Sequence, residues 1–258
     1  MSLRDQTIVV TGASSGIGKM MALQFARQGA KIVLAARSAP ELDALAATIR
    51  AAGGHALAVP TDVTSDADVQ RLVERTLAEF GRLDVLINNA GYGIFAPIEQ
   101  ADMAHIAGMM NVNYFGTMRC TLAVLPAMRR QNRGHIVNIA SVAGLVSTPN
   151  MGAYSASKHA VVAATQAMQV ELMDSPVRCS LICPGPIDTP FFVQADYDKM
   201  SRLAKIFGLL DPDDVVNVVG AVVQHPRTMR VTPRGFHLLA VAYRLFPFLT
   251  RRVLRWVG

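Results

Sequence analysis

The fold is decided by the stretch Thr7-Ile-Val-Val-Thr11-Gly12-Ala-Ser-Ser-Gly16-Ile-Gly18. Its first five residues are β-branched, which is typical of a buried strand. A glycine-rich turn follows at once, and residues 19–28 then have the pattern of a helix. Glycines allow a tight turn and a close approach to a pyrophosphate, and a helix N-terminus offers unpaired N–H groups to that anion. This order therefore favours a dinucleotide site over a plain turn between a strand and a helix.

The alternation of strand and helix continues along the chain. The expected further strands are Lys31–Ala36, His55–Pro60, Asp84–Asn88, His135–Ser141, Arg178–Cys183 and Thr228–Thr232, and the expected further helices are Glu41–Ala52, Asp66–Phe80, Met103–Arg130 and Tyr154–Met173. This alternation predicts an α/β fold of the Rossmann type, a doubly wound parallel sheet of about seven strands with helices on both faces. With 258 residues, 51% of them hydrophobic, and no linker-like tract, a single domain spanning residues 1–258 is expected.

The net charge of +6 is concentrated at one end of the chain. Seven arginines lie in the last 32 residues: Arg227, Arg230, Arg234, Arg244, Arg251, Arg252 and Arg255. The remainder is nearly neutral and contains no nucleic-acid-binding motif, so no nucleic-acid partner is expected. The three cysteines, Cys120, Cys179 and Cys183, fit no zinc pattern, so buried reduced thiols and a cytoplasmic protein are expected. The N-terminus lacks the apolar core of a signal peptide, and no segment offers the ~18 uncharged apolar residues of a spanning helix.

Three of the expected strands end in side chains suited to a dinucleotide. Arg37 follows the second strand, where NAD-binding units carry an acid for the ribose 2′-hydroxyl. Its guanidinium favours the 2′-phosphate of NADP, although a solvated loop arginine is the alternative reading. Asp62 and Val63 follow the third strand, where an adenine edge can lie. Asn88 and Asn89 end the fourth strand, and two buried amides there can cross-link strands and fix the floor of the cofactor site.

Proton-transfer chemistry is indicated by Tyr154 and Lys158, which stand four residues apart and so share one face of a helix. A nearby ammonium favours the phenolate, so Lys158 is expected to lower the pKa of Tyr154 from its usual value near ~10. Ser141 lies 13 residues before Tyr154, at the end of an apolar run, where it can join the pair. By itself a Tyr-x-x-x-Lys pattern arises by chance in many helices, so its meaning depends on the rest of the chain.

An interruption is expected inside the long helix between residues 103 and 130. The segment Asn111-Val-Asn113-Tyr-Phe-Gly116 places asparagine and glycine mid-helix, where both are unfavourable. Such a break indicates a kink with a function, or a glycine required for packing.

Together these motifs resemble the short-chain dehydrogenase/reductase family, of the single-domain type. The resemblance extends from about Thr7 to Thr189 and is weaker beyond. It is carried, in the order of the family, by Thr11-Gly12-x-x-x-Gly16-x-Gly18, Asn88-Asn89-Ala90-Gly91, Asn113, Ser141, Tyr154-x-x-x-Lys158 and Pro184-Gly185. The joint match is far more specific than any single motif.

The resemblance implies a role for each matching residue. Tyr154 would be the general acid in reduction and the base in oxidation, and Ser141 would bind the substrate oxygen. Lys158 would lower the pKa of Tyr154 and hydrogen-bond the nicotinamide ribose, and Asn113 would hold a water that links Lys158 to solvent. The implied cofactor-binding set is Gly12, Ser14, Ser15, Gly16, Ile17, Gly18, Arg37, Asp62, Val63, Asn89, Ala90, Gly91, Tyr154, Lys158, Pro184, Gly185, Ile187 and Thr189. Hydride passes directly between nicotinamide and carbon, so no metal is expected.

The cofactor preference depends on one departure from the family pattern. Members that prefer NADP often carry a basic residue just before the second glycine of the loop, where this chain has Ser15. The expectation of NADP(H) over NAD(H) therefore depends on Arg37 and on the absence of an acid at position 36.

Apolar residues near the expected site favour a lipophilic ketone, aldehyde or secondary alcohol as substrate. The expected substrate contacts are Ser141, Leu145, Met151, Tyr154, Phe191 and Phe192, with Val146, Met200, Ile206, Phe207 and Leu209 as further wall candidates. Most of these lie after the fifth strand or in a substrate-loop region, residues 190–210, and some can equally belong to the core. An NAD-dependent dehydrogenase of the same fold and a non-catalytic dinucleotide-sensing protein remain as alternatives. The complete catalytic set argues against the second.

The C-terminal segment, residues 235–258, alternates apolar residues with arginine, and Pro247 is expected to break or kink it. A basic amphipathic stretch suits peripheral contact with an anionic membrane. Packing over the substrate opening or against another subunit is the favoured alternative. The family commonly forms dimers and tetramers, so the resemblance also implies a homo-oligomer.

Overall fold

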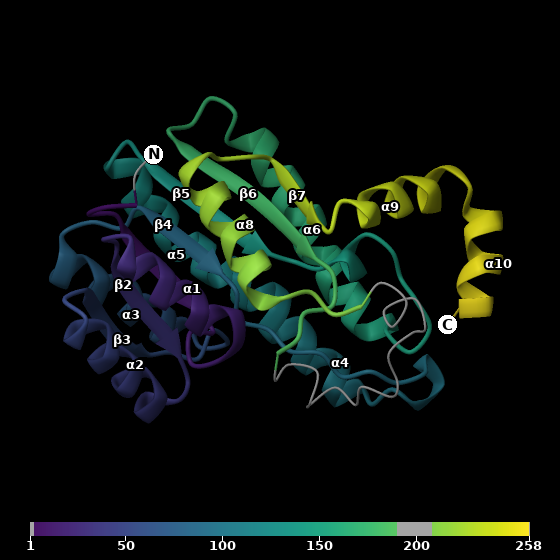
Figure 1. The fold of residues 1–258 in the computed structure, drawn as a ribbon, viewed down its shortest axis with the longest axis horizontal. Coiled ribbons are helices and arrows are strands. Elements are labelled where there is room, and N and C mark those ends of the chain that lie inside the picture. Colours follow the sequence, from purple (N-terminus) through teal and green to yellow (C-terminus); the bar gives the residue numbers. More distant parts are fainter. Residues whose placement is uncertain (1–2, 190–207, 258) are drawn as a thin grey trace.

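The computed structural model describes residues 3–189 and 208–257, and within residues 251–257 it describes the side chains of Arg252 and Arg255. Five expected substrate-wall residues lie outside the described residues: Phe191, Phe192, Met200, Ile206 and Phe207. Among the described residues, seven parallel strands form one sheet in the order β3-β2-β1-β4-β5-β6-β7 (Figure 1). The expected doubly wound α/β fold is confirmed.

The strands are β1 (Thr7–Thr11), β2 (Lys31–Ala36), β3 (His55–Pro60), β4 (Val85–Asn88), β5 (Gly134–Ile139), β6 (Val177–Pro184) and β7 (Met229–Thr232). The α-helices are α1 (Gly16–Arg27), α2 (Ala39–Ala51), α3 (Asp66–Phe80), α4 (Met103–Met109), α5 (Thr117–Arg130), α6 (Gly152–Glu171), α8 (Pro212–Gln224), α9 (Gly235–Leu245) and α10 (Pro247–Val257). All seven strands lie where the apolar runs predicted them, with small differences at their ends. Helix α8 was not predicted.

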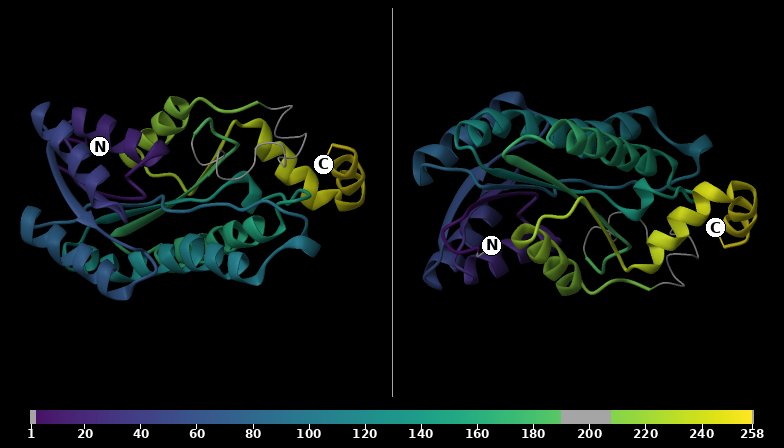
Figure 2. Two further views of the ribbon diagram at one scale, coloured as in Figure 1. Left: turned by 90° about the horizontal axis from the view of Figure 1, so that it is seen from below. Right: turned by 90° about the horizontal axis from the view of Figure 1, so that it is seen from above.

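Helices cover both faces of the sheet, as the two edge views show (Figure 2). Successive side chains of a strand point to opposite faces, so β1 contributes to two cores. Ile8 and Val10 pack with α1, α2 and α8, whereas Val9 packs on the side of α3, α5 and α6. All five residues of β1 are buried, which explains its unbroken β-branched sequence.

Helix α8 has a strand-like composition but a clear helix start. Its core-facing side is made largely of valine, which is more typical of strands. Asp211 caps the helix, because its side chain accepts a hydrogen bond from the N–H of Asp213 at 2.8 Å, and Pro212 occupies the first turn. The helix packs against α1, where Gly220 lies close to the ring of Phe25.

The long helix expected over residues 103–130 is interrupted, as predicted. Helix α4 passes into a π-helical segment, Met110–Gly116, which leads directly into α5. A π-helical turn changes the hydrogen-bonding pattern by one residue and often marks a functional site. The segment contains Asn113, which is buried.

The chain ends in two helices that extend away from the sheet (Figure 1). Helix α9 ends at Leu245 and α10 begins at Pro247, so the proline breaks the segment as expected. In the described part of the chain, no helix has the length and apolar character needed to cross a membrane.

Candidate active site

A cavity of about 1160 Å³ lies at the carboxyl ends of the strands. The chain runs from β1 to β2 and β3 in one direction along the sheet, and from β4 to β7 in the other. In open α/β sheets ligands bind at this reversal point, outside the strand ends. The glycine turn after β1, the loops after β2 to β6 and the start of α9 all contribute to the lining.

The glycine turn has the close packing that a pyrophosphate cradle requires. Gly12 has φ +67°, and a Cβ there would lie 2.9 Å from the Cα of Ala90. A Cβ on Gly18 would lie 2.2 Å from the carbonyl oxygen of Gly12. Gly16 has φ +52° and opens toward Thr189, whose side chain would be 3.8 Å from an added Cβ. These positions accept no larger residue without a shift of the backbone.

The half-buried amide of Asn89, just after β4, holds this turn in place. Asn89 donates from Nδ2 to the carbonyl oxygen of Thr11 at 2.9 Å, and the N–H groups of Asn89 and Ala90 both bond to the Thr11 hydroxyl. Asn88 donates to Oδ1 of Asn138 on the neighbouring strand β5, also at 2.9 Å. The prediction that two amides cross-link neighbouring strands is confirmed, with Asn88 buried and Asn89 half-buried.

The N-terminus of α1 fits the diphosphate of a dinucleotide. The first turn contains no acidic residue, and the Ser15 side chain makes no capping hydrogen bond. The first backbone N–H groups of α1 therefore have no capping side chain, and the cavity is lined here by Gly12, Ser14, Ser15, Gly16, Ile17 and Gly18. Free N–H groups and the positive end of the helix dipole favour an anion at this point.

At the other end of the predicted dinucleotide site, Arg37 and Asp62 line the cavity just after β2 and β3. Arg37 is exposed, and no carboxylate among the described residues pairs with it. Asp62 is held in place, because its Oδ1 accepts from the N–H and the hydroxyl of Thr64 at 2.8 and 2.7 Å. Val63, Ala90 and Gly91 also line the cavity.

The catalytic candidates lie on the floor of the same cavity. Tyr154, in the first turn of α6, is buried and packs edge-on against the ring of Phe95, with 5.5 Å between ring centroids. Its side chain is hydrogen-bonded to that of Ser141, which follows β5. Ser141 also accepts from the N–H of Ala143 at 3.1 Å. The fold thus brings together a serine and a tyrosine that are 13 residues apart in sequence.

The pKa values of the pair differ from the sequence-based expectation. Burial raises the pKa of Tyr154 to about 12, against a smaller lowering by the hydrogen bond to Ser141. Burial also lowers the pKa of Lys158 to about 8. The Lys158 ammonium lies 6.0 Å from the centre of the Tyr154 ring, and at this distance desolvation of the phenol outweighs it. The expectation that the pKa of Tyr154 is lowered was therefore wrong for the protein without a bound dinucleotide.

Lys158 and Asn113 are fixed by backbone contacts. Lys158 donates to the carbonyl oxygen of Ile139 at 3.1 Å, which holds its ammonium beside the end of β5. Asn113 bonds to both backbone groups of Tyr92 at 2.9 Å and donates to the Ser157 hydroxyl at 2.9 Å. Asn113 is not among the residues that line the cavity; it lies behind them and ties the loop after β4 to α6.

The cavity wall agrees only in part with the expected substrate contacts. Met151, Val146 and Tyr154 line the cavity. Leu145 does not: it is buried in a cluster with Ala140 and Val161, so its assignment to the substrate wall was wrong. The 3₁₀ turn Val142–Gly144 directs neighbouring side chains to different sides, which the apolar sequence did not reveal.

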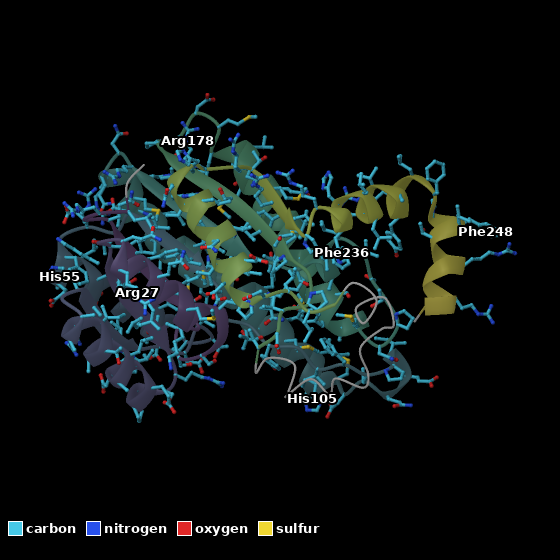
Figure 3. All side chains as sticks on the ribbon, in the orientation of Figure 1. Arg27, His55, His105, Arg178, Phe236 and Phe248 are labelled. Atoms are coloured by element: carbon cyan, nitrogen blue, oxygen red, sulfur yellow. The ribbon has the colours of Figure 1, made fainter. Side chains whose placement is uncertain are left out.

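Several lining residues were missed. Phe95, Val142, Phe236 and Leu239 line the cavity, and Phe236 lies at the sheet-proximal start of α9 (Figure 3). The last two come from the C-terminal segment, for which packing over the substrate opening was one of the predicted placements. Pro184, Gly185, Ile187 and Thr189 line the cavity as expected.

Comparison with known proteins identifies the family of the chain. A family model described as short chain dehydrogenase matches residues 6–199. An uncharacterised oxidoreductase of Staphylococcus saprophyticus is 38% identical, with 90% of this chain and 96% of that protein covered. The ketoacyl reductase HetN of a Nostoc species is 32% identical, with 100% of this chain and 91% of that protein covered.

Solved structures show the same fold. A short chain dehydrogenase/reductase from Burkholderia phymatum, in complex with NAD, has a TM-score of 0.87 and 31% identity, with 96% of each chain covered. A 3-ketoacyl-(acyl-carrier-protein) reductase from Brucella melitensis, complexed with NADH, has a TM-score of 0.81 and 30% identity, with 90% of this chain and 98% of that chain covered. An alcohol dehydrogenase from Thermococcus sibiricus, complexed with 5-hydroxy-NADP, has a TM-score of 0.78 and 28% identity, with 88% and 95% covered.

Proposed function

Because this chain belongs to the short chain dehydrogenase family, we propose that it is an NADP-dependent oxidoreductase that reduces a lipophilic ketone or aldehyde, or oxidises the corresponding secondary alcohol. NAD(P)-dependent oxidoreductase activity follows from the family. One observation carries the more specific proposal. The hydrogen-bonded pair Tyr154 and Ser141, with Lys158 beside it, lies in the same cavity as the glycine turn.

In the proposed reduction, Tyr154 and Ser141 act on the carbonyl oxygen of the substrate. The nicotinamide, when bound, supplies hydride to the carbonyl carbon. The Tyr154 hydroxyl donates its proton to the oxygen, and the Ser141 hydroxyl hydrogen-bonds the same oxygen and stabilises the charge that develops on it. Lys158, whose pKa of about 8 keeps it largely protonated at neutral pH, favours the phenolate left behind. A proton from solvent then restores the phenol, and Asn113 is the proposed holder of the relaying water.

The charges of the cavity support NADP. Arg37 is exposed at the carboxyl end of β2, and no carboxylate among the described residues neutralises it. A free guanidinium at this place is available to a 2′-phosphate, whereas the end of β2 lacks the acid that binds the two ribose hydroxyls of NAD in NAD-binding units. Ala36 occupies the last position of the strand.

The lining of the cavity supports a lipophilic substrate. The charged side chains among the described lining residues are Arg37, Asp62 and Lys158. The first two lie near the proposed adenosine end, and the third lies beside Tyr154. The remaining wall near Tyr154 includes Phe95, Val142, Val146, Met151, Phe236 and Leu239. No described cation is thus left over for a substrate carboxylate, and the apolar wall suits a hydrocarbon. Relatives named as ketoacyl reductases add support for carbonyl reduction.

NAD dependence is the second candidate, favoured by two neighbouring structures that were solved with NAD or NADH. The discriminating variant is Arg37→Asp, with Arg50→Asp as the matched control, because Arg50 is an exposed arginine at the end of α2 that does not line the cavity. A carboxylate at position 37 repels a 2′-phosphate and can bind a 2′-hydroxyl.

The measurement is kcat/KM for NADPH and NADH with a panel of steroid, retinoid, fatty and aromatic carbonyl compounds. We expect the NADPH/NADH ratio of Arg37→Asp to fall by about a hundredfold or more, since one charge-assisted contact is replaced by repulsion, and the ratio of Arg50→Asp to stay unchanged. An unchanged ratio in Arg37→Asp refutes the role of Arg37. Tight NADPH binding with no turnover across the whole panel refutes the enzymatic proposal in favour of a dinucleotide sensor.

A further inference from the structure

The α9–α10 arm (residues 235–257) exposes an unusual number of apolar side chains. Of the twelve large hydrophobic residues that are exposed in the described part of the chain, six lie between positions 238 and 249. They are Leu238, Val241, Leu245, Phe246, Phe248 and Leu249. Figure 3 shows Phe248 on α10, at the far end of the arm from Phe236. A concentration of exposed apolar side chains on one segment points to an interaction site.

Helix α9 is apolar on two sides. Phe236 and Ala240 are buried, and Leu239 packs against the core and lines the cavity. Leu238, Val241 and Leu245, which are spaced three and four residues apart, face away from the core and are exposed. The core therefore accounts for one side of the helix and leaves the other without a partner in the described structure.

The charged side chains of the arm itself all have one sign. No Asp or Glu occurs after Asp214 in the sequence. Arg244, Arg252 and Arg255 are exposed along the arm, and Arg234 is exposed just before it. The guanidinium of Arg252 lies 5.1 Å from the centre of the Phe248 ring, so cationic and aromatic groups share one surface. Apolar side chains bordered by arginine are what the interface of an anionic bilayer binds.

We propose that the α9–α10 arm docks on an anionic lipid surface. A second copy of the chain is the rival occupant, but symmetric pairing of two arms would bring their arginines together with no carboxylate on either arm to neutralise them. An anionic phospholipid surface provides anions for the arginines of the arm and hydrocarbon for its exposed apolar side chains. Docking concerns the arm alone and does not depend on which carbonyl compound the enzyme reduces.

Docking by this arm would place the cavity near the membrane. Phe236 and Leu239 line the cavity from the core-facing side of α9, and Leu238 and Val241 occupy its exposed side. A substrate dissolved in the bilayer would then need to pass only the width of one helix to reach the wall of the active site. This arrangement suits the lipophilic substrate proposed above.

The test is co-sedimentation of the full-length protein with vesicles. One set contains phosphatidylcholine alone, and the other contains phosphatidylcholine mixed with phosphatidylglycerol. We expect the partition coefficient to be about a hundredfold higher for the anionic vesicles, since each arginine near the surface is attracted by the anionic headgroups. The difference should shrink as salt is added, because the attraction is screened.

Two pairs of variants locate the contact. Phe248 and Met103 are exposed to a similar degree, 74% and 71%, and only the first lies on the arm. We expect Phe248→Ser to weaken binding to anionic vesicles by about ten- to a hundredfold, the value of burying one such side chain, and Met103→Ser to have no effect. Arg252→Gln should weaken binding about fivefold, and Arg130→Gln, on the exposed end of α5, should not.

Thermal melts of all four variants show whether the fold is intact, so a loss of vesicle binding is not confused with unfolding. Equal binding to neutral and anionic vesicles overturns the proposal, and so does equal behaviour of Phe248→Ser and Met103→Ser. A third outcome is that the wild type does not bind vesicles and the arm variants change the sedimentation coefficient of the free protein. In that case the arm is a contact between subunits and the lipid proposal is wrong.

Discussion

The sheet body and the α9–α10 arm use apolar residues in opposite ways. In β1 every residue is buried, and the apolar side chains of α1 and α8 face the sheet. In the arm, side chains as large as Leu238 and Phe248 are exposed. Residues 1–214 also contain all 19 acidic residues together with 18 of the 25 lysines and arginines. Among Asp, Glu, Lys and Arg, the segment after them contains arginine alone. Burial within the chain explains why the body is rich in apolar residues. The apolar residues of the arm require contact with a surface outside the chain.

This difference separates two proposed activities: the catalytic candidates lie in the body, and the proposed docking surface is the exposed side of the arm. A variant of a catalytic candidate or of an exposed arm side chain should therefore change one activity and leave the other intact. The three variants below all lie in the body, and each tests whether the separation holds.

The largest effect is expected from Tyr154→Phe. The change removes the proposed proton donor but keeps the ring that packs on Phe95, so the fold should not change. We expect kcat to fall by about a thousandfold, the usual value of a general acid, with NADPH affinity and vesicle binding unchanged. Tyr114→Phe is the control, since Tyr114 does not line the cavity. Turnover that survives in Tyr154→Phe would mean that another group supplies the proton.

The wild-type pH profile should agree with this assignment. Because burial raises the pKa of Tyr154 to about 12, the phenol is protonated and able to donate throughout the neutral range. In the direction of oxidation the phenolate is required, so that rate should rise with pH up to the limit of enzyme stability.

A smaller effect is expected from Gly18→Ala. The new Cβ would lie 2.2 Å from the Gly12 carbonyl oxygen, so α1 must move away from the glycine turn. Overpacking of this kind costs about 1–3 kcal/mol of folding free energy, and we expect the displaced turn to bind the dinucleotide about tenfold more weakly. Fluorescence titration with NADPH measures it. Gly235→Ala is the control, because a Cβ at that position meets no atom within 4 Å. Vesicle binding should be the same in both variants.

The smallest effect on activity is expected at His135, which should change only the pH dependence of stability. Burial lowers the pKa of His135 to about 4, against an ordinary value of 6.5. The unfolded chain therefore binds a proton more readily, so the stabilisation by neutral His135 is complete above about pH 6.5 and is lost as the pH falls toward 4. The loss is on the order of 3 kcal/mol if the whole shift counts.

The corresponding variant is His135→Gln, whose amide can still bond to the Ser180 hydroxyl that His135 contacts at 2.8 Å. Its melting temperature should decline less than that of the wild type between pH 7 and pH 5. His55→Gln, at the exposed start of β3, should follow the wild type. If His135→Gln has the same pH dependence as the wild type, the histidine is not the titrating group.

Much of the body could be predicted from local patterns. A β-branched run, a glycine-rich turn and a helical pattern predict β1 and α1. These signals depend only on residues that are close together in the sequence. The same reasoning placed Tyr154 and Lys158 on one helix face and found the break at Asn113, which the structure forms as a π-helical segment. Helix α8 was missed because its valines suggest a strand, although Asp211 and Pro212 signal a helix start.

The properties that the sequence did not reveal depend on residues that are distant along the chain. Leu145 is buried and Val142 lines the cavity, because one 3₁₀ turn directs them differently. Tyr154 has a raised pKa because Phe95, Met109 and Ala143, from three other segments, exclude water from its ring. Sequence alone thus determined the fold class, the strand positions and the candidate catalytic side chains, since these depend on local residue type and spacing. Only the tertiary structure decided which side chains line the cavity, how the tyrosine titrates and which side of α9 remains exposed, since burial is set by the packing of distant segments.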